Sequence, residues 1–317
     1  MRRFILTLRS GISALTKLFS AGRSQKKTSN LLILLALATL LPSLALGYDV
    51  LVLQSRSDPA YDEVLKGFRF EQKSSLRLLV LSDYAEVDIV RIVREDRPRL
   101  ILAVGDAALT AARKVQQTPV VAVMSLGIHN RKESHPNLTG IGMFAHPERY
   151  IDLFRAMKIK RVGVIYNPAR SGWYLRLARQ AAAAAGIELV TREVSAPRET
   201  VERLATLAGR VDALWMLPDS TAVTRETTEA YFRFGQQQAV PVISFAANYL
   251  GLGAAAVLEI DRVAIGSQAD AMVAALLRGN RTDSMPLDFP SGITVKTNPS
   301  VLRRLGSSFN ASGFRFK

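Results

Sequence analysis

Small polar residues follow six apolar runs of this sequence, and they are the residues best suited to bind a ligand. They occupy residues 54–58, 105–107, 125–127, 167–171, 218–221 and 246–248. Their hydroxyl, amide and backbone N–H groups can hydrogen-bond a small molecule, although each residue alone could also serve as a helix cap. Because the carboxyl ends of parallel strands meet at one edge of a sheet, the six segments together favour a binding cleft.

Two acids and two arginines stand out in these segments. Asp106 directly follows a predicted strand and precedes a predicted helix, so its charge would offset a helix N-terminus that could otherwise hold an anion. If Asp106 and Asp219 both face the cleft, they suit an amine or another donor-rich group of the ligand. Arg56 or Arg170 would then be the partner of an acidic group. The alternative is that both acids are solvated caps.

Sequence motifs for catalysis, cofactor binding and metal binding are missing. There is no G-x-S-x-G, no G-x-x-x-x-G-K-[ST] and no G-x-G-x-x-G after a strand. His129, His135 and His146 lack metal-ligand spacing, and we expect them in an exposed segment between lobes. Basic residues are scattered without interleaved aromatic residues, which argues against a nucleic-acid partner. We therefore predict no catalytic residue, no metal and no cofactor.

Strand-length apolar runs alternate with helix-length amphipathic segments from Tyr48 onward. The runs are continuous, as in strands buried on both faces. The predicted strands are residues 49–54, 77–81, 100–104, 120–124, 161–166, 188–194, 213–217, 240–245, 254–260 and 293–297. The predicted helices include residues 107–114, 171–186 with Ser171 as the N-cap, 264–277 and 300–305. This order predicts parallel α/β sheets, in two lobes joined near residues 125–142.

The composition is that of a globular protein with an uneven charge. The chain has 317 residues, 48% hydrophobic and 22% charged, enough for one large or two medium domains. The first 47 residues hold seven Lys and Arg and no acid, which leaves 35 basic against 27 acidic residues, a net +8, in the rest. The absence of Cys excludes disulfides, thiolate metal sites and a Cys nucleophile.

Residues 1–47 have the features of a signal peptide. Lys26 and Lys27 precede the uncharged run 31–41, and Pro42 and residues 45–47 (ALG) follow it as a helix break and a small-x-small cleavage site. An 11-residue run is too short to span a bilayer, which takes roughly 20. We predict cleavage near Gly47 and a periplasmic location. The segment before the run is long for a signal peptide. The alternatives are that translation starts downstream of Met1, or that the segment is an uncleaved amphipathic leader.

Seven segments between residues 137 and 306 resemble one protein family. They are NLTGI (137–141), KRVGVIYNP (160–168), AAGIEL (184–189), DALWMLPDSTAV (212–223), VPVISFAANYLGLGA (240–254), ALLRGN (275–280) and VKTNPSVLRRLG (295–306). In their order and spacing, they resemble the ABC-transporter substrate-binding proteins whose better-known members take up aromatic amino acids. The first half matches more loosely, through residues 50–55 and 100–109.

This resemblance implies a type I periplasmic-binding-protein fold. Each of two lobes would be a parallel sheet flanked by helices, with three crossings between lobes and a ligand enclosed by hinge closure. The expected lobes are residues 48–127 with 247–285, and residues 128–246 with 286–306. Residues 307–317 would form a C-terminal tail.

The resemblance also assigns site residues by position. Ser55, Gly105, Asp106 and Ser125 would line the first lobe, Asn167, Asp219 and Ser220 the second, and Phe245 and Asn248 a hinge. The polar segments described above add Arg56 and Ser171. The sequence departs from the family at Gly105-Asp106, where a small hydroxyl or Gly-Thr is common, and at apolar residues 254–261, where a polar turn containing Tyr is usual.

The predicted function is an exported, monomeric solute-binding protein that delivers a small molecule to an ABC permease in the inner membrane. A periplasmic sensor or accessory subunit with the same fold is one alternative, and an α/β enzyme is another.

Overall fold

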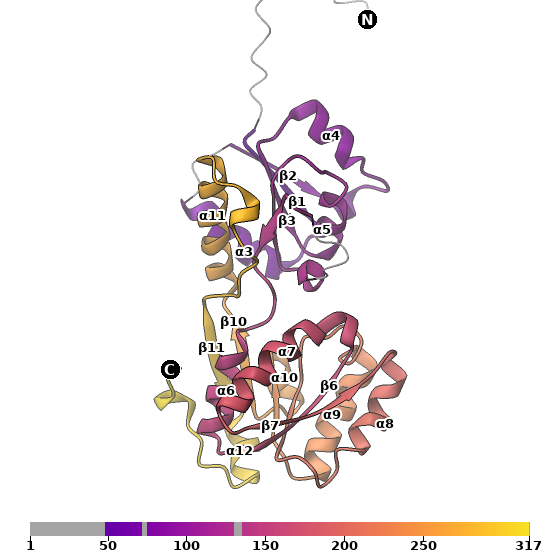
Figure 1. The fold of residues 1–317 in the computed structure, drawn as a ribbon, viewed down its shortest axis with the longest axis vertical. Helices are drawn as coiled ribbons and strands as arrows, with labels where there is room; N and C mark the ends of the chain where they lie inside the picture. The colour runs from indigo at the N-terminus through magenta and orange to yellow at the C-terminus, as the bar shows by residue number, and fades with distance from the viewer. Residues whose placement is uncertain (1–47, 72–74, 130–134, 317) are drawn as a thin grey trace, which may run out of the picture. The chain divides into compact units, whose positions relative to one another are not determined.

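The computed structural model describes residues 48–71, 75–129 and 135–316, with only the backbone at residues 69–71. The predicted signal peptide, residues 1–47, lies outside the described residues. The two-lobed α/β architecture predicted from the sequence is confirmed, with one sheet in each lobe (Figure 1).

The first lobe contains a fully parallel sheet in the order β2-β1-β3-β4-β5. Its strands are β1 (Val50–Gln54), β2 (Leu76–Val80), β3 (Leu100–Val104), β4 (Val120–Val123) and β5 (Leu138–Gly140). Every residue of β1, β3 and β4 is buried, which agrees with the continuous apolar runs of the sequence.

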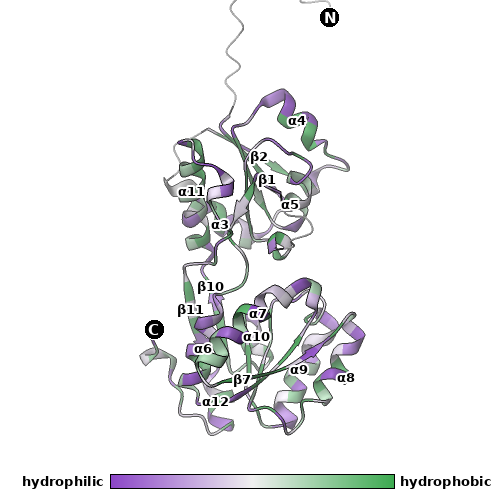
Figure 2. Ribbon diagram, viewed as in Figure 1, coloured by the Kyte–Doolittle hydropathy of each residue, from purple (hydrophilic) through white to green (hydrophobic). Residues whose placement is uncertain are grey.

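The second lobe contains a six-stranded sheet in the order β11-β10-β9-β8-β6-β7. Its strands are β6 (Arg161–Tyr166), β7 (Glu188–Glu193), β8 (Ala213–Trp215), β9 (Val242–Ser244), β10 (Ala256–Ile260) and β11 (Ile293–Thr297). All neighbours pair in parallel except β11, which runs antiparallel to β10 at the edge. Apolar side chains lie on both faces of each sheet, and β1 is green in Figure 2.

Helices flank both sheets. They are α3 (Pro59–Glu71), α4 (Ile89–Asp96), α5 (Asp106–Ala112), α6 (Pro147–Ala156), α7 (Pro168–Ala184), α8 (Thr200–Ala205), α9 (Arg225–Gln237), α10 (Asn248–Leu252), α11 (Arg262–Leu277) and α12 (Pro299–Arg304). No helix in the described part of the chain has the length and apolar character needed to span a membrane.

The prediction that Ser171 caps the helix over residues 171–186 is wrong. The helix α7 begins three residues earlier, at Pro168, and the side chain of Asn167 caps it by accepting a hydrogen bond from the Ala169 N–H at 2.9 Å. Proline is favoured at the first helical position because its missing N–H has no partner there. Ser171 is therefore inside the first turn, where it is fully buried.

Two strands lie in other lobes than predicted. β5, expected in the second lobe, pairs with β4 of the first sheet, and β10, expected in the first lobe with α10, pairs with β9 of the second sheet. Short apolar runs indicate that a strand forms, but they do not identify its neighbour in the sheet. The predicted boundaries at residues 128 and 247 are thus too early for these strands.

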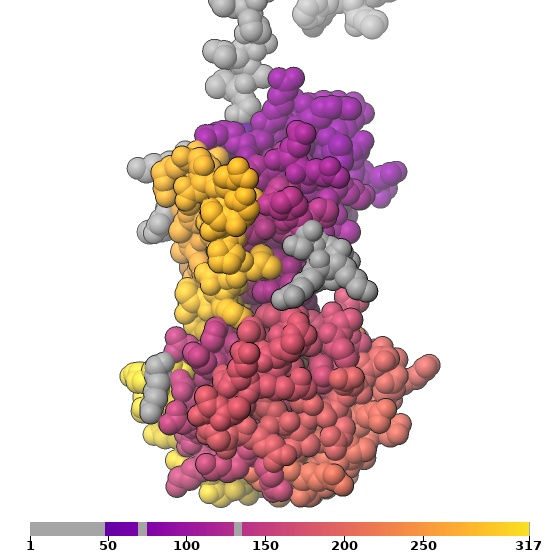
Figure 3. Space-filling model, viewed as in Figure 1, coloured from indigo at the N-terminus to yellow at the C-terminus, as the bar shows by residue number. Residues whose placement is uncertain are grey.

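The chain crosses between the lobes three times, as the resemblance implied. The crossings follow β5, separate β10 from α11, and precede β11. The first and third crossings are joined by backbone hydrogen bonds, from Gly142 N–H to Asp288 O and from Asp288 N–H to Gly140 O, each 2.9 Å. In Figure 3 the orange and yellow atoms that include the third crossing form a strip from one lobe to the other.

α11 returns to the first lobe and packs closely on α3, beside which it lies in Figure 1. Glycines make this approach possible, because a Cβ on Gly266 would lie 2.0 Å from the Val64 carbonyl oxygen and a Cβ on Gly67 2.1 Å from that of Val263. Two segments almost 200 residues apart are thereby fixed together in one lobe.

The expected C-terminal tail packs on the second lobe. Phe309, Phe314 and Phe316 contact the apolar core that covers one face of its sheet. The guanidinium of Arg149 on α6 lies 4.9 Å from the centre of the Phe316 ring.

Candidate functional site

A pocket of about 400 Å³ lies between the two lobes, and we call it the cleft pocket. Its lining comes from the ends of strands in both sheets and from the first two crossings. The lining residues are Ala60, Met124, Leu126, Met143, Pro218, Asp219, Ser220, Val223, Thr224, Phe245, Ala246, Glu259, Ile260 and Arg262. Most of these side chains are apolar, as is usual in a site for a small organic molecule.

A second pocket of about 250 Å³, which we call the side pocket, adjoins the first and is more polar. It shares Leu126, Pro218 and Ser220 with the cleft pocket. Its other lining residues are Asp106, Thr110, Arg113, Gly127, Phe144, Ala169 and Arg170. Both lobes therefore contribute polar groups to a common space.

Asp219 lies at the cleft pocket, but its carboxylate is already fully hydrogen-bonded. Oδ2 accepts from the Asn167 backbone N–H at 2.8 Å and from the Ser171 hydroxyl, and Oδ1 accepts from the backbone N–H groups of Thr221 (2.9 Å) and Ala222 (3.0 Å). These four bonds occupy the acceptor positions of a carboxylate, and the residue is 1% exposed. The structure thus contradicts the expectation that Asp219 presents a free carboxylate to a ligand amine.

Asp106 holds the loop after β4. Its carboxylate accepts hydrogen bonds from the Ser125 hydroxyl, from the Gly127 N–H at 2.9 Å and from the Leu126 N–H at 3.4 Å. Unlike Asp219, Asp106 is an exposed residue and lines the side pocket. Ser125 is fully buried and acts through Asp106, outside the lining of both pockets.

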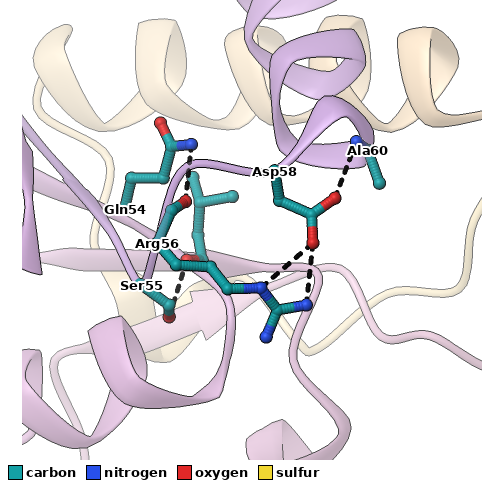
Figure 4. Close-up of polar contacts among 6 residues, drawn as sticks. Gln54, Ser55, Arg56, Asp58 and Ala60 are labelled. Atoms are coloured by element: carbon teal, nitrogen blue, oxygen red, sulfur yellow. Dashed lines mark hydrogen bonds and ion pairs between the residues drawn. The ribbon is translucent and has the colours of Figure 1, made fainter. Parts of the chain in front are cut away.

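The segment after β1 forms a network of its own (Figure 4). The Ser55 hydroxyl donates to the Val104 carbonyl at 3.0 Å and accepts from the Ala108 N–H at 2.9 Å, which satisfies the start of α5. Gly105 precedes this helix with a φ of +92°, and a Cβ there would lie 2.4 Å from the Tyr61 hydroxyl oxygen. Both residues position α5 and line neither pocket.

Arg56 points to Asp58 and lines neither pocket. Its Nη2 lies 2.7 Å from Asp58 Oδ2, and Asp58 Oδ1 accepts from the Ala60 N–H at 2.9 Å, as Figure 4 shows. The Ala60 hydrogen bond, followed by the Arg56 guanidinium, lowers the pKa of Asp58. Arg56 and Asp58 therefore stabilise the first turn of α3 beside the cleft pocket.

Of the remaining predicted residues, some line a pocket and others hold the lining residues in place. Ser220 is exposed and lines both pockets, and Phe245 lines the cleft pocket. Asn167 and Ser171 hold Asp219, while Asn248 is an exposed residue at the start of α10.

Phe245 and Asn248 follow β9 inside the second lobe, so the prediction that they lie at a hinge is wrong: the nearest crossing follows β10.

Sequence reasoning missed the residues contributed by the crossings. Glu259 and Arg262 flank the second crossing, and each is paired: Lys296 contacts Glu259, and Arg262 Nη1 lies 2.9 Å from Glu63 Oε2. Met143 on the first crossing and Met124 after β4 add apolar surface. The sequence carries a signal for Glu259, because it is an acid at the end of an otherwise apolar strand.

His129 lies at an aromatic contact between the lobes instead of in an exposed segment. Its ring stacks on Trp173 of α7, with ring centroids 3.7 Å apart and planes 24° apart. Burial lowers its pKa to about 4, and Nε2 has no hydrogen-bond partner among the described residues. Within the part of the chain that the structure describes, no three acidic or histidine side chains cluster as metal ligands.

Comparison with protein families gives one match that covers most of the chain. A family described as ABC transporter substrate binding protein matches residues 73–312. A tyrosine-binding protein of Clostridioides difficile (strain R20291) is 20% identical over 221 residues, 66% of this chain. The match spans 64% of that relative's length.

Solved structures share the fold at low sequence identity. A ligand-free, open substrate-binding protein with adhesive properties from Clostridium difficile has a TM-score of 0.64 and 18% identity. An ABC domain in complex with L-Trp from Streptococcus pneumonia has a TM-score of 0.59 and 19% identity. Each comparison covers 83% of this chain and 96% of the other.

Proposed function

The chain belongs to the ABC transporter substrate-binding protein family, and from that premise we propose that it binds one small solute between its two lobes and delivers it to an ABC permease. The observation that carries this proposal is the cleft pocket, because its lining combines residues of the first lobe, such as Met124, with residues of the second, such as Phe245. A solute that contacts both linings favours the closed arrangement of the lobes, which a permease can distinguish from the open one.

We propose that the solute is recognised by apolar contact and by groups around Ser220, and not by the buried Asp219. The relatives named for tyrosine and L-Trp support a ligand with an apolar side group. The proposed role needs no cofactor and no turnover. It also requires export, for which residues 1–47 supply the sequence features of a cleavable signal peptide.

The proposal is tested by identifying the solute that the protein carries. The chain would be expressed from its full reading frame and purified without refolding, and the small molecules released on denaturation would be identified by mass spectrometry. The proposal predicts one enriched solute that rebinds at a 1:1 ratio in calorimetry and makes the protein more compact in X-ray scattering. Chemical conversion of that solute by the protein would contradict the proposal.

A further inference from the structure

We propose that the side pocket receives an acidic group of the solute, so that the natural ligand carries a carboxylate, phosphate or sulfate on an apolar body; this inference rests on the proposed function above. The two adjoining pockets differ in the charged groups that line them and in which of these groups are already paired.

Two arginines reach the side pocket from opposite lobes. Arg113 follows the last turn of α5 in the first lobe, and its Nη2 donates to the Gly127 carbonyl at 2.9 Å, which fixes the guanidinium at the wall. Arg170 belongs to the first turn of α7 in the second lobe and is exposed. Arg170 has no ion-pair partner among the described residues, so its donors are available.

The side pocket has a net positive wall. Among the described lining residues the one carboxylate is Asp106, and its oxygens already accept from the Ser125 hydroxyl and from two backbone N–H groups. Two guanidinium groups, those of Arg113 and Arg170, line the same pocket. An entering carboxylate, phosphate or sulfate would gain charge-assisted hydrogen bonds from arginine, which are stronger than bonds between neutral groups.

The cleft pocket offers no comparable place for an anion. Its cation, Arg262, is paired with Glu63 at 2.9 Å, and Glu259 is in contact with Lys296. The apolar lining of the cleft pocket suits the body of a ligand, and the shared wall at Leu126, Pro218 and Ser220 lets one molecule extend into both pockets.

This arrangement also links anion binding to closure. Because Arg113 and Arg170 belong to different lobes, an anion that contacts both is bound more strongly when the lobes are together. The acidic group would therefore favour closure as well as contribute to affinity.

The experiment compares ligands that differ only in the acidic group. L-tyrosine and L-tryptophan, the solutes named for relatives, are each paired with the decarboxylated amine, tyramine or tryptamine, and binding is measured by calorimetry. We expect the parent chain to bind each acid at least about tenfold more tightly than its amine. Arg170→Gln should lower the affinity for the acid about tenfold and leave that for the amine unchanged.

Arg176→Gln is the matched control. Arg176 lies on the same helix, is also exposed and lines neither pocket, so its loss changes the net charge equally without touching the site. Equal binding of acid and amine by the parent, or equal effects of the two arginine variants, would overturn the proposal.

The solute released from the purified protein gives a second readout. A carboxylate, phosphate or sulfate in that solute supports the side pocket as its acid site, whereas a solute without any acidic group overturns this inference and leaves the proposed function intact. If no probe binds and no solute is released, the proposed function fails and this inference fails with it.

Discussion

The carboxylate of Asp219 accepts a hydrogen bond of 2.8 Å from the backbone N–H of Asn167, which ties the loop after β8 to the start of α7. The same carboxylate oxygen also accepts from the buried Ser171 hydroxyl. An acid that looks like a ligand-binding residue in the sequence is therefore a structural anchor beneath the cleft pocket.

Asp219→Ala should consequently act on stability. It leaves four donors without their acceptor in a buried site, and we expect the free energy of unfolding to fall by about 3 kcal/mol. Urea unfolding at neutral pH measures this loss. Ser220→Ala removes only a hydroxyl group from the exposed neighbour and should change stability by less than about 0.5 kcal/mol. Equal stability of Asp219→Ala and Ser220→Ala would refute the anchoring role.

This case shows why the sequence predicted the fold better than the site. The continuous apolar run at Leu100–Val104 is enough to predict a buried strand, because burial on both faces requires apolar residues at every position. A polar residue after a strand, in contrast, can either bind a ligand or cap a helix. Ser55, Ser125 and Asn167 satisfy backbone groups or carboxylates, and only the three-dimensional positions of their partners reveal this.

The residues on the crossings were missed for a related reason. Glu259 and Arg262 reach the cleft pocket because β10 belongs to the second sheet and α11 to the first lobe. Neither local propensity nor hydrophobic periodicity specifies which sheet a strand joins. The resemblance predicted the number of crossings, but the expected boundaries placed the first two too early along the chain.

The contact between α3 and α11 gives a prediction about the first lobe. Gly266→Ala would place a Cβ 2.0 Å from the Val64 carbonyl oxygen, so the helices must separate. We expect the free energy of unfolding to fall by at least about 3 kcal/mol in urea titrations. Gly251→Ala is the control, because a Cβ there has no atom within 4 Å and alanine favours the helix α10. A Gly266→Ala chain as stable as Gly251→Ala would show that the two helices are not held at this distance.

The shared wall of the two pockets gives a prediction about binding. Ser220→Trp introduces a large ring at an exposed position that lines both pockets, and it should occupy the space of the ligand. We expect the amount of co-purified solute, measured by mass spectrometry, to fall at least about tenfold while thermal stability stays near that of the parent. Ser195→Trp places the same ring at an exposed serine of the second lobe that lines neither pocket, and it should retain the solute. Full retention by Ser220→Trp would mean that the solute binds elsewhere.

The stack of His129 on Trp173 gives a prediction about pH. Burial lowers the pKa of His129 from 6.5 to about 4, so between these values the unfolded chain binds a proton that the folded chain does not. The contribution of neutral His129 is therefore complete above about pH 6.5 and is lost as the pH falls toward 4, by about 2 kcal/mol between pH 7.5 and pH 5. His129→Phe keeps an aromatic ring against Trp173 but removes the titration, so its stability should fall less over this interval in urea unfolding. His135→Phe serves as the control and should keep the acid sensitivity of the parent. If His129→Phe loses as much stability as the parent between the two pH values, protonation of the stacked ring does not weaken the contact that joins the lobes.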